Sequence, residues 1–65
     1  MKYREGQMVT PKVKYGVQDA WFGVNCKVIS RWFFNGNNMY LIDNGLDSPE
    51  NCGRKVYVEN DLRAR

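Results

Sequence analysis

The hydrophobic pattern is clearest between residues 25 and 43, where two apolar runs flank a polar cluster, NGNN, at residues 35–38. Asn and Gly adopt positive φ angles more readily than other residues, and such a cluster between β-rich runs is typical of a β-hairpin. No segment has a sustained helical period of apolar residues. We therefore expect an all-β domain organised around this hairpin.

Alternation along the two strands divides the hairpin residues between two faces. A loop of two residues (Asn35 and Gly36) or of four gives the same face partners, whereas a loop of three exchanges them. With an even loop, the predicted core face carries no charge: Cys26, Val28, Ser30, Trp32, Phe34, Met39 and Leu41. The opposite face, here the basic-aromatic face, combines cations with apolar residues: Lys27, Ile29, Arg31, Phe33, Tyr40 and Ile42.

The basic-aromatic face has two interpretations. Strand twist can place some of its apolar residues under loops, with the stems of Lys27 and Arg31 lying over apolar surface. Alternatively, the face binds a ligand, because cations contact phosphates and rings stack on bases or anchor an interface. Rings could also form a cage for a cationic ligand. By alternation, exposure is expected for Phe33, Tyr40 and Tyr57.

The segment before the hairpin predicts one strand and a less regular connection. A first strand is expected at residues 7–11, ending at Pro11, which cannot donate a hydrogen bond to a ladder. Residues 12–23 either extend this strand or form a long loop. Trp21 and Phe22 are adjacent, so only one of them can face the core from a strand.

The segment after the hairpin predicts a turn, a loop and a last strand. Asp-Asn-Gly at residues 43–45 indicates a turn, and residues 46–55 have the composition of a loop. Residues 54–59 alternate in the manner of a strand, and residues 60–62 predict a single helical or 3₁₀ turn. Leu62 is expected to close one end of the domain.

Several loose motifs along the chain follow a known pattern: Tyr3-x-x-Gly6-Gln7-x-Val9, a Gly23-led strand with Val28, Tyr40-Leu41-Ile42-Asp43, and Val56-Tyr57-Val58-x-x-Asp61-Leu62. Over nearly its whole length the chain resembles a small SH3-like barrel of the Tudor and KOW class. Gln7 stands where that family usually has Asp. The resemblance implies a single domain, residues 1–65, with five strands and a short 3₁₀ turn near the C-terminus. It also implies binding of nucleic acid, peptide or modified side chains.

A weaker similarity of outline is to plasmid-borne type II dihydrofolate reductase, a tetramer whose pore is built around a Val-Gln-Ile-Tyr strand. The matching stretch here is Lys55-Val56-Tyr57-Val58, which lacks the glutamine. That departure removes the residue type which the folate and nicotinamide contacts of that family require.

Length and charge set limits on these expectations. A chain of 65 residues forms one domain near the lower limit for a self-sufficient core. Ten Lys and Arg residues against seven acids give a net charge of +3, which permits nucleic-acid binding without requiring it. The basic residues concentrate in residues 1–14 and at Arg63 and Arg65.

Catalysis is not indicated, and we expect neither enzyme activity, nor a cofactor, nor a metal site. The chain has no histidine, so Cys26 and Cys52 lack the usual base for nucleophilic catalysis and are too few for a zinc site. Reduced thiols, with Cys26 buried, are favoured over a disulfide between the two. Acidic residues such as Asp43 and Asp47 are expected to accept hydrogen bonds from turn amides.

No apolar run approaches the roughly 20 residues of a membrane span. The first residues, MKYREGQ, contain no hydrophobic signal core. The expectation is a cytoplasmic protein with no membrane partner.

Two hypotheses for function follow. In the first, the chain is a non-catalytic binding module that contacts DNA or RNA through these residues: Lys27, Arg31, Phe33, Tyr40, Lys12, Lys14, Lys55 and Tyr57. The alternative is a protein-interaction or assembly module, such as a small accessory protein of a phage or mobile element. Its partner or homo-oligomer interface would be formed by Ile29, Phe33, Tyr40 and Ile42.

Overall fold

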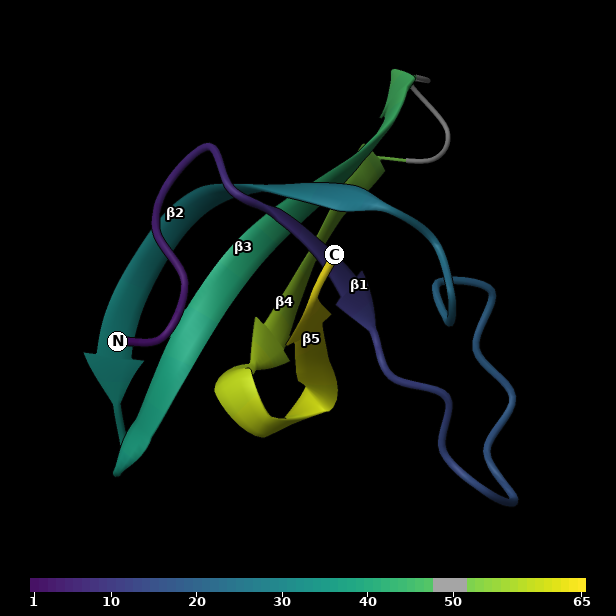
Figure 1. Ribbon diagram of the computed structural model, residues 1–65, viewed down its shortest axis with the longest axis horizontal. Helices are drawn as coiled ribbons and strands as arrows, with labels where there is room; N and C mark the ends of the chain where they lie inside the picture. The colour runs from purple at the N-terminus through teal and green to yellow at the C-terminus, as the bar shows by residue number, and fades with distance from the viewer. Residues whose placement is uncertain (48–51) are drawn as a thin grey trace.

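The computed structural model describes residues 1–47 and 52–65, and it is all-β as predicted (Figure 1). Its elements are β1 (Met8–Pro11), β2 (Cys26–Phe34), β3 (Asn37–Asp47), β4 (Cys52–Val58), the 3₁₀ turn η1 (Glu59–Asp61) and β5 (Leu62–Ala64). They form one antiparallel sheet in the order β4-β3-β2-β1-β5. In the described part of the chain no ladder joins β4 to β5, so hydrogen bonds do not close the sheet into the expected barrel.

The loop of the central hairpin contains two residues, which is one of the two even lengths that were considered. Asn35 and Gly36 have φ angles of 52° and 80°, and Phe34 pairs directly with Asn37. Two consecutive positive φ angles are the requirement of the type I′ turn, whose twist matches that of the flanking strands. The predicted hairpin is therefore confirmed, and of the two even loops it has the shorter one.

A β-bulge in β2 reverses the face assignment that was predicted for the hairpin. Val28 pairs with Ile42 and Ser30 with Leu41, so Ile29 is one residue too many for its partner strand. An inserted residue shifts the alternation of β2 by one position relative to its partner strand. The β2 side chains beyond the bulge therefore lie on the opposite face from the one that regular alternation would give them. Before the bulge, Cys26 and Val28 point inward as predicted; beyond it, the assignment is inverted.

The predicted core face is therefore wrong for its members beyond the bulge. Trp32 and Phe34 keep 37% and 64% of their surface exposed, while Tyr40 and Ile42 are fully buried. On β4 the same ladder places Tyr57 opposite Tyr40 on the inner side and leaves Val56 exposed. The inward positions of β3, Tyr40 and Ile42, are thus ones that the alternation alone had assigned to the basic-aromatic face, and Tyr57 of β4 shares their side.

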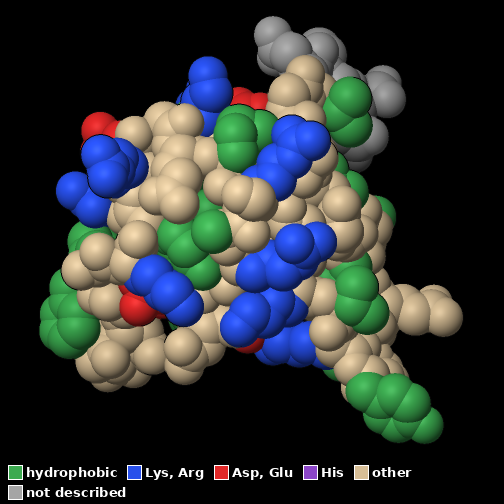
Figure 2. All heavy atoms as spheres, viewed as in Figure 1, with side chains coloured by type: hydrophobic (Ala, Val, Ile, Leu, Met, Phe, Trp, Pro, Cys, Tyr) green, Lys and Arg blue, Asp and Glu red, His purple; other side chains and the backbone are tan. Residues whose placement is uncertain are grey.

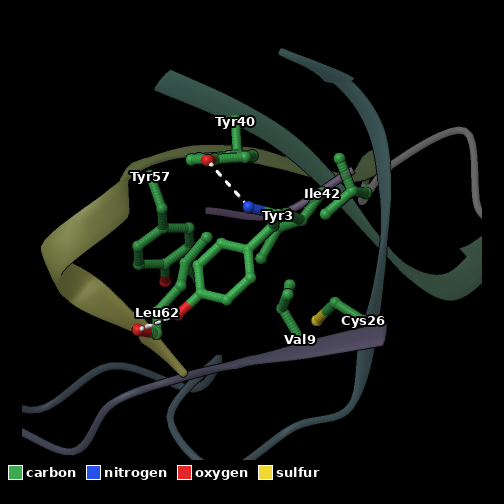
Figure 3. Packing of buried hydrophobic residues seen from close by; sticks show 8 residues of the cluster. Tyr3, Val9, Cys26, Tyr40, Ile42, Tyr57 and Leu62 are labelled. Atoms are coloured by element: carbon green, nitrogen blue, oxygen red, sulfur yellow. Dashed lines mark hydrogen bonds between the residues drawn. The ribbon is translucent and has the colours of Figure 1, made fainter. Parts of the chain in front are cut away.

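The core lies between this curved sheet and the segments that cross its inner side (Figure 3). Tyr3 from the N-terminal segment, Val9 from β1 and Leu62 from β5 pack with Tyr40 and Ile42 of β3. Leu62 is buried, as expected for a residue that closes one end of the domain. The rings of Tyr3 and Tyr40 meet edge-on with centroids 5.4 Å apart, a favoured geometry for aromatic pairs.

The buried tyrosine hydroxyls have hydrogen-bond partners, which reduces the penalty of burying a polar group. The Tyr3 hydroxyl donates to the Leu62 carbonyl at 2.9 Å, and the Tyr40 hydroxyl accepts from the Tyr3 amide at 3.2 Å. These bonds attach the N-terminal segment to both β3 and β5. Buried Cys26 is a free cysteine, in agreement with the prediction of a reduced thiol.

The chain around residues 43–47 differs from the predicted turn and loop. Gly45 has a φ of 83°, and its amide donates to the Asp43 carboxylate at 2.7 Å, yet β3 continues to Asp47 with a shift in register. Of the predicted loop at residues 46–55, the part at 48–51 lies outside the described residues. Gly53 packs so closely that a Cβ atom would overlap the Leu46 carbonyl oxygen.

Candidate nucleic-acid interface

The eight side chains expected at a binding surface are distributed over the core and four parts of the surface. Two of them, Tyr40 and Tyr57, keep 0% and 8% of their surface exposed. Their predicted exposure is wrong: they lie opposite each other on β3 and β4, on the side that the core covers, and the bulge in β2 places Cys26 and Val28 on that same side. Burial raises the pKa of both tyrosine hydroxyls.

Lys55 is engaged with the long connection between β1 and β2. Its ammonium lies 2.8 Å from the Asp19 carboxylate, which also accepts a hydrogen bond from the Tyr57 hydroxyl at 3.0 Å. The Lys55 hydrogen bond, followed by that of the Trp21 amide, lowers the pKa of Asp19 to about 2. This cluster attaches the connection to β4, so we assign Lys55 an anchoring role.

Lys27 lies on the outer side of the sheet, away from the other predicted residues. The ladder places Lys27, Asp43 and Arg54 side by side on β2, β3 and β4. Arg54 Nε is 3.0 Å from Asp43, whose pKa is lowered by the Gly45 amide first and by Arg54 second. A cavity of about 300 Å³ adjoins this row, lined by Met8, Asn25, Lys27, Ile29, Asp43, Asn44 and Gly45. Asp43 neutralises Arg54, and Lys27 leaves the row with a net charge of +1.

Arg31 and Phe33 lie together near the end of the hairpin. They occupy alternate positions of one strand and so share a face. Phe33 keeps 70% of its surface exposed, which confirms the prediction for this ring. Arg31 Nη1 donates to the Tyr3 carbonyl at 2.7 Å, so its guanidinium extends over the N-terminal segment. Tyr3 is flanked in the sequence by two further cations, Lys2 and Arg4.

Lys12 and Lys14 are brought against the C-terminal strand, where two further cations lie. The Lys12 amide donates to the Asp61 carbonyl at 2.8 Å, and the Lys14 ammonium lies 2.9 Å from the Asp61 carboxylate. Arg63 pairs with Thr10 of β1, and the Arg65 amide donates to the Met8 carbonyl at 3.4 Å. Figure 2 shows Lys and Arg side chains gathered where β5 and the C-terminus lie in Figure 1.

We call this cluster the basic surface, and it comprises Lys12, Lys14, Tyr15, Arg63 and Arg65. Tyr15 belongs to it because it follows Lys14 on a connection that projects from the body of the domain, and its side chain is fully exposed. Within the described residues, Lys12, Arg63 and Arg65 have no carboxylate partner. The concentration of Arg63 and Arg65 at the C-terminus was visible in the sequence. Their proximity to Lys12 was not, because it depends on the pairing of β1 with β5.

No helix in the described part of the chain is long and apolar enough to cross a membrane. No protein-family model, no curated protein and no solved structure matches the chain.

Proposed function

We propose that the chain is a non-catalytic binding module that contacts nucleic acid through the basic surface. The observation that carries the proposal is the convergence of four cations from two distant segments, of which Lys14 alone is paired, with the neighbouring Asp61. Unpaired Lys and Arg side chains at such a surface can each neutralise a phosphate and release its counterion.

The exposed ring of Tyr15 supports single-stranded nucleic acid as the preferred form. Stacking of a base on an aromatic side chain contributes about 1–3 kcal/mol and tolerates any base. A fully exposed tyrosine beside two lysines combines such a stacking platform with phosphate contacts. We therefore propose binding with little sequence preference. Cytoplasmic location remains part of this proposal.

For the fold, we propose the SH3-like class. The support is the order of five short antiparallel strands with a 3₁₀ turn between the last two. The open edge between β4 and β5 would correspond to an incompletely paired seam of such a barrel.

The function is tested by fluorescence anisotropy of a labelled 20-nucleotide single strand, and of the matching duplex, at 50 and 200 mM salt. We expect affinity to fall steeply with salt and the single strand to bind more tightly. The variant Lys12→Gln/Arg63→Gln should weaken binding and reduce the slope of log affinity against log salt by about 1.4 on the single strand and about 1.8 on the duplex, the values for two lost phosphate contacts.

The matched control is Lys27→Gln/Arg54→Gln, which removes the same two residue types from the outer side of the sheet. It should bind as the unmodified protein does. Absence of binding at 50 mM salt would refute nucleic-acid binding, and an equal loss in the control would refute the assignment to the basic surface.

A further inference from the structure

The outer side of β2, β3 and β4 carries a continuous apolar surface. The bulge and the ladders place six apolar side chains there: Trp32, Met39 and Val58 form one row across the three strands, Leu41 and Val56 lie in the next row, and Phe34 lies two residues beyond Trp32 on β2. We call it the apolar outer face: Trp32, Phe34, Met39, Leu41, Val56 and Val58. Trp32, Phe34 and Val56 keep 37%, 64% and 44% of their surface exposed. These positions include much of the charge-free set that the sequence had assigned to the core.

The size of this face is sufficient for the centre of a protein interface. An aromatic side chain presents about 200 Å² when free, so Trp32 and Phe34 together leave about 200 Å² exposed. Val56 and the three partly exposed residues extend the patch toward the roughly 300–600 Å² that is often functional on a monomer. A standard interface buries about 800 Å² per partner, with an apolar centre and a polar rim.

The distribution of charge indicates which partner fits this face. None of its six side chains is charged, and in the neighbouring row Arg54 is paired with Asp43, so that Lys27 leaves this row outside the face with a net charge of +1. The face therefore offers no charge that would select an acidic or a basic partner. A second copy of the chain needs no such charge, because a two-fold interface matches the same apolar patch to itself.

The positive charge of the chain does not oppose this association. Leu62 points into the core, so Arg63 at the next position of β5 points away from it, on the side opposite β3. The shortest extent of the domain is 23 Å. Two domains in contact through their outer faces would thus hold their basic surfaces much farther apart than the Debye length of about 8 Å at physiological salt.

We propose that the apolar outer face is the interface of a two-fold homodimer, in which two sheets pack back to back. Burial of Trp32 and Phe34 against a second copy gives a domain of 65 residues additional apolar contact that its own core does not supply. The two basic surfaces then face away from each other, on opposite sides of the dimer.

The hairpin offers a matched pair of variants for the test. Phe34→Glu places a charge on the apolar outer face, whereas Phe33→Glu places the same charge on the adjacent residue of the other face, with similar exposure. Sedimentation equilibrium should give twice the 7.6 kDa chain mass for the unmodified protein and for Phe33→Glu. Phe34→Glu should raise the dissociation constant of the dimer at least roughly 30-fold, the loss expected for a central interface anchor.

A second pair keeps the test decisive if a hairpin variant fails to fold, as judged by circular dichroism. Val56→Glu should give a monomer, and Val13→Glu, in the exposed connection after β1, should remain a dimer. A monomer for the unmodified protein at several hundred micromolar would overturn the proposal. Dimers that persist in Phe34→Glu and Val56→Glu would also overturn it, as would dissociation of the controls.

Discussion

The hydroxyl of Tyr40 links the N-terminal segment to the 3₁₀ turn η1, and its removal tests how much stability this linkage provides. The side chain is fully buried, and its hydroxyl donates to Glu59 Oε1 at 2.5 Å while it accepts from the Tyr3 amide at 3.2 Å. Glu59 also accepts from the Lys2 amide at 2.6 Å and from the Asn38 side chain at 3.2 Å. One oxygen thus joins three segments of the chain.

Tyr40→Phe removes this oxygen and preserves the ring. The buried Tyr3 amide then lacks its acceptor, at a penalty of about 1–3 kcal/mol, and Glu59 loses a charge-assisted bond of about 1.5–3 kcal/mol. Relaxation and water reduce the sum, so we expect the free energy of unfolding to fall by about 2–4 kcal/mol. For a domain this small, that is a large share of the total stability.

The measurement is urea unfolding at pH 7, followed by tryptophan fluorescence. Tyr15→Phe is the matched control, because Tyr15 is fully exposed and its change should stay within about 0.5 kcal/mol. A loss below 0.5 kcal/mol in Tyr40→Phe would show that the linkage contributes little, and the reasoning would fail.

The same network predicts an acid dependence of stability. Hydrogen bonds from Tyr40 first and from the Lys2 amide second lower the pKa of Glu59 from 4.5 to about 2. Because the folded-state pKa lies below the unfolded one, this stabilisation is present above about pH 4.5 and is lost as the pH falls toward 2. Tyr40→Phe and Glu59→Gln should therefore lose less stability across this window than the unmodified protein. Equal acid dependence in all three would contradict the assignment.

Two further variants test the remaining anchors of the fold. Gly53→Ala should lower the free energy of unfolding by about 1–3 kcal/mol, because its methyl group would overlap the Leu46 carbonyl and the strand must shift; an unchanged melting temperature would exclude that contact. Asp19→Asn should weaken the attachment of the connection between β1 and β2 to Lys55 and Tyr57, and amide hydrogen exchange in that connection should accelerate. The pKa of Asp19 is lowered from 3.8 to about 2, chiefly by Lys55, so in the unmodified protein the protection of these amides, relative to their intrinsic exchange rate at each pH, should also fall as the pH falls through that range. Protection that is independent of both changes would refute the anchoring role.

Much of the candidate site could not be predicted from the sequence because it depends on contacts between distant segments. Lys12 and Lys14 were identified, yet their proximity to Arg63 and Arg65 follows from the pairing of β1 with β5. Phe33 was correctly expected to be exposed, since it lies near the end of the hairpin beyond the core. Tyr40 was expected to be exposed and is buried, because it lies on the side of β3 that the core covers, and the bulge in β2 places the start of that strand on the same side.

The sequence by itself determined the local features. The Asn and Gly residues at 35–38 specify a hairpin turn, because they tolerate positive φ angles, and β-rich alternation specifies an all-β chain with that hairpin at its centre. The tertiary structure alone decided which face of that hairpin is the core. A bulge at Ile29 has no distinct residue signature, and the N-terminal segment, β1 and β5 cover the side that carries Tyr40 and Ile42. Alternation defines two faces, but only packing against distant segments determines which of them is removed from water.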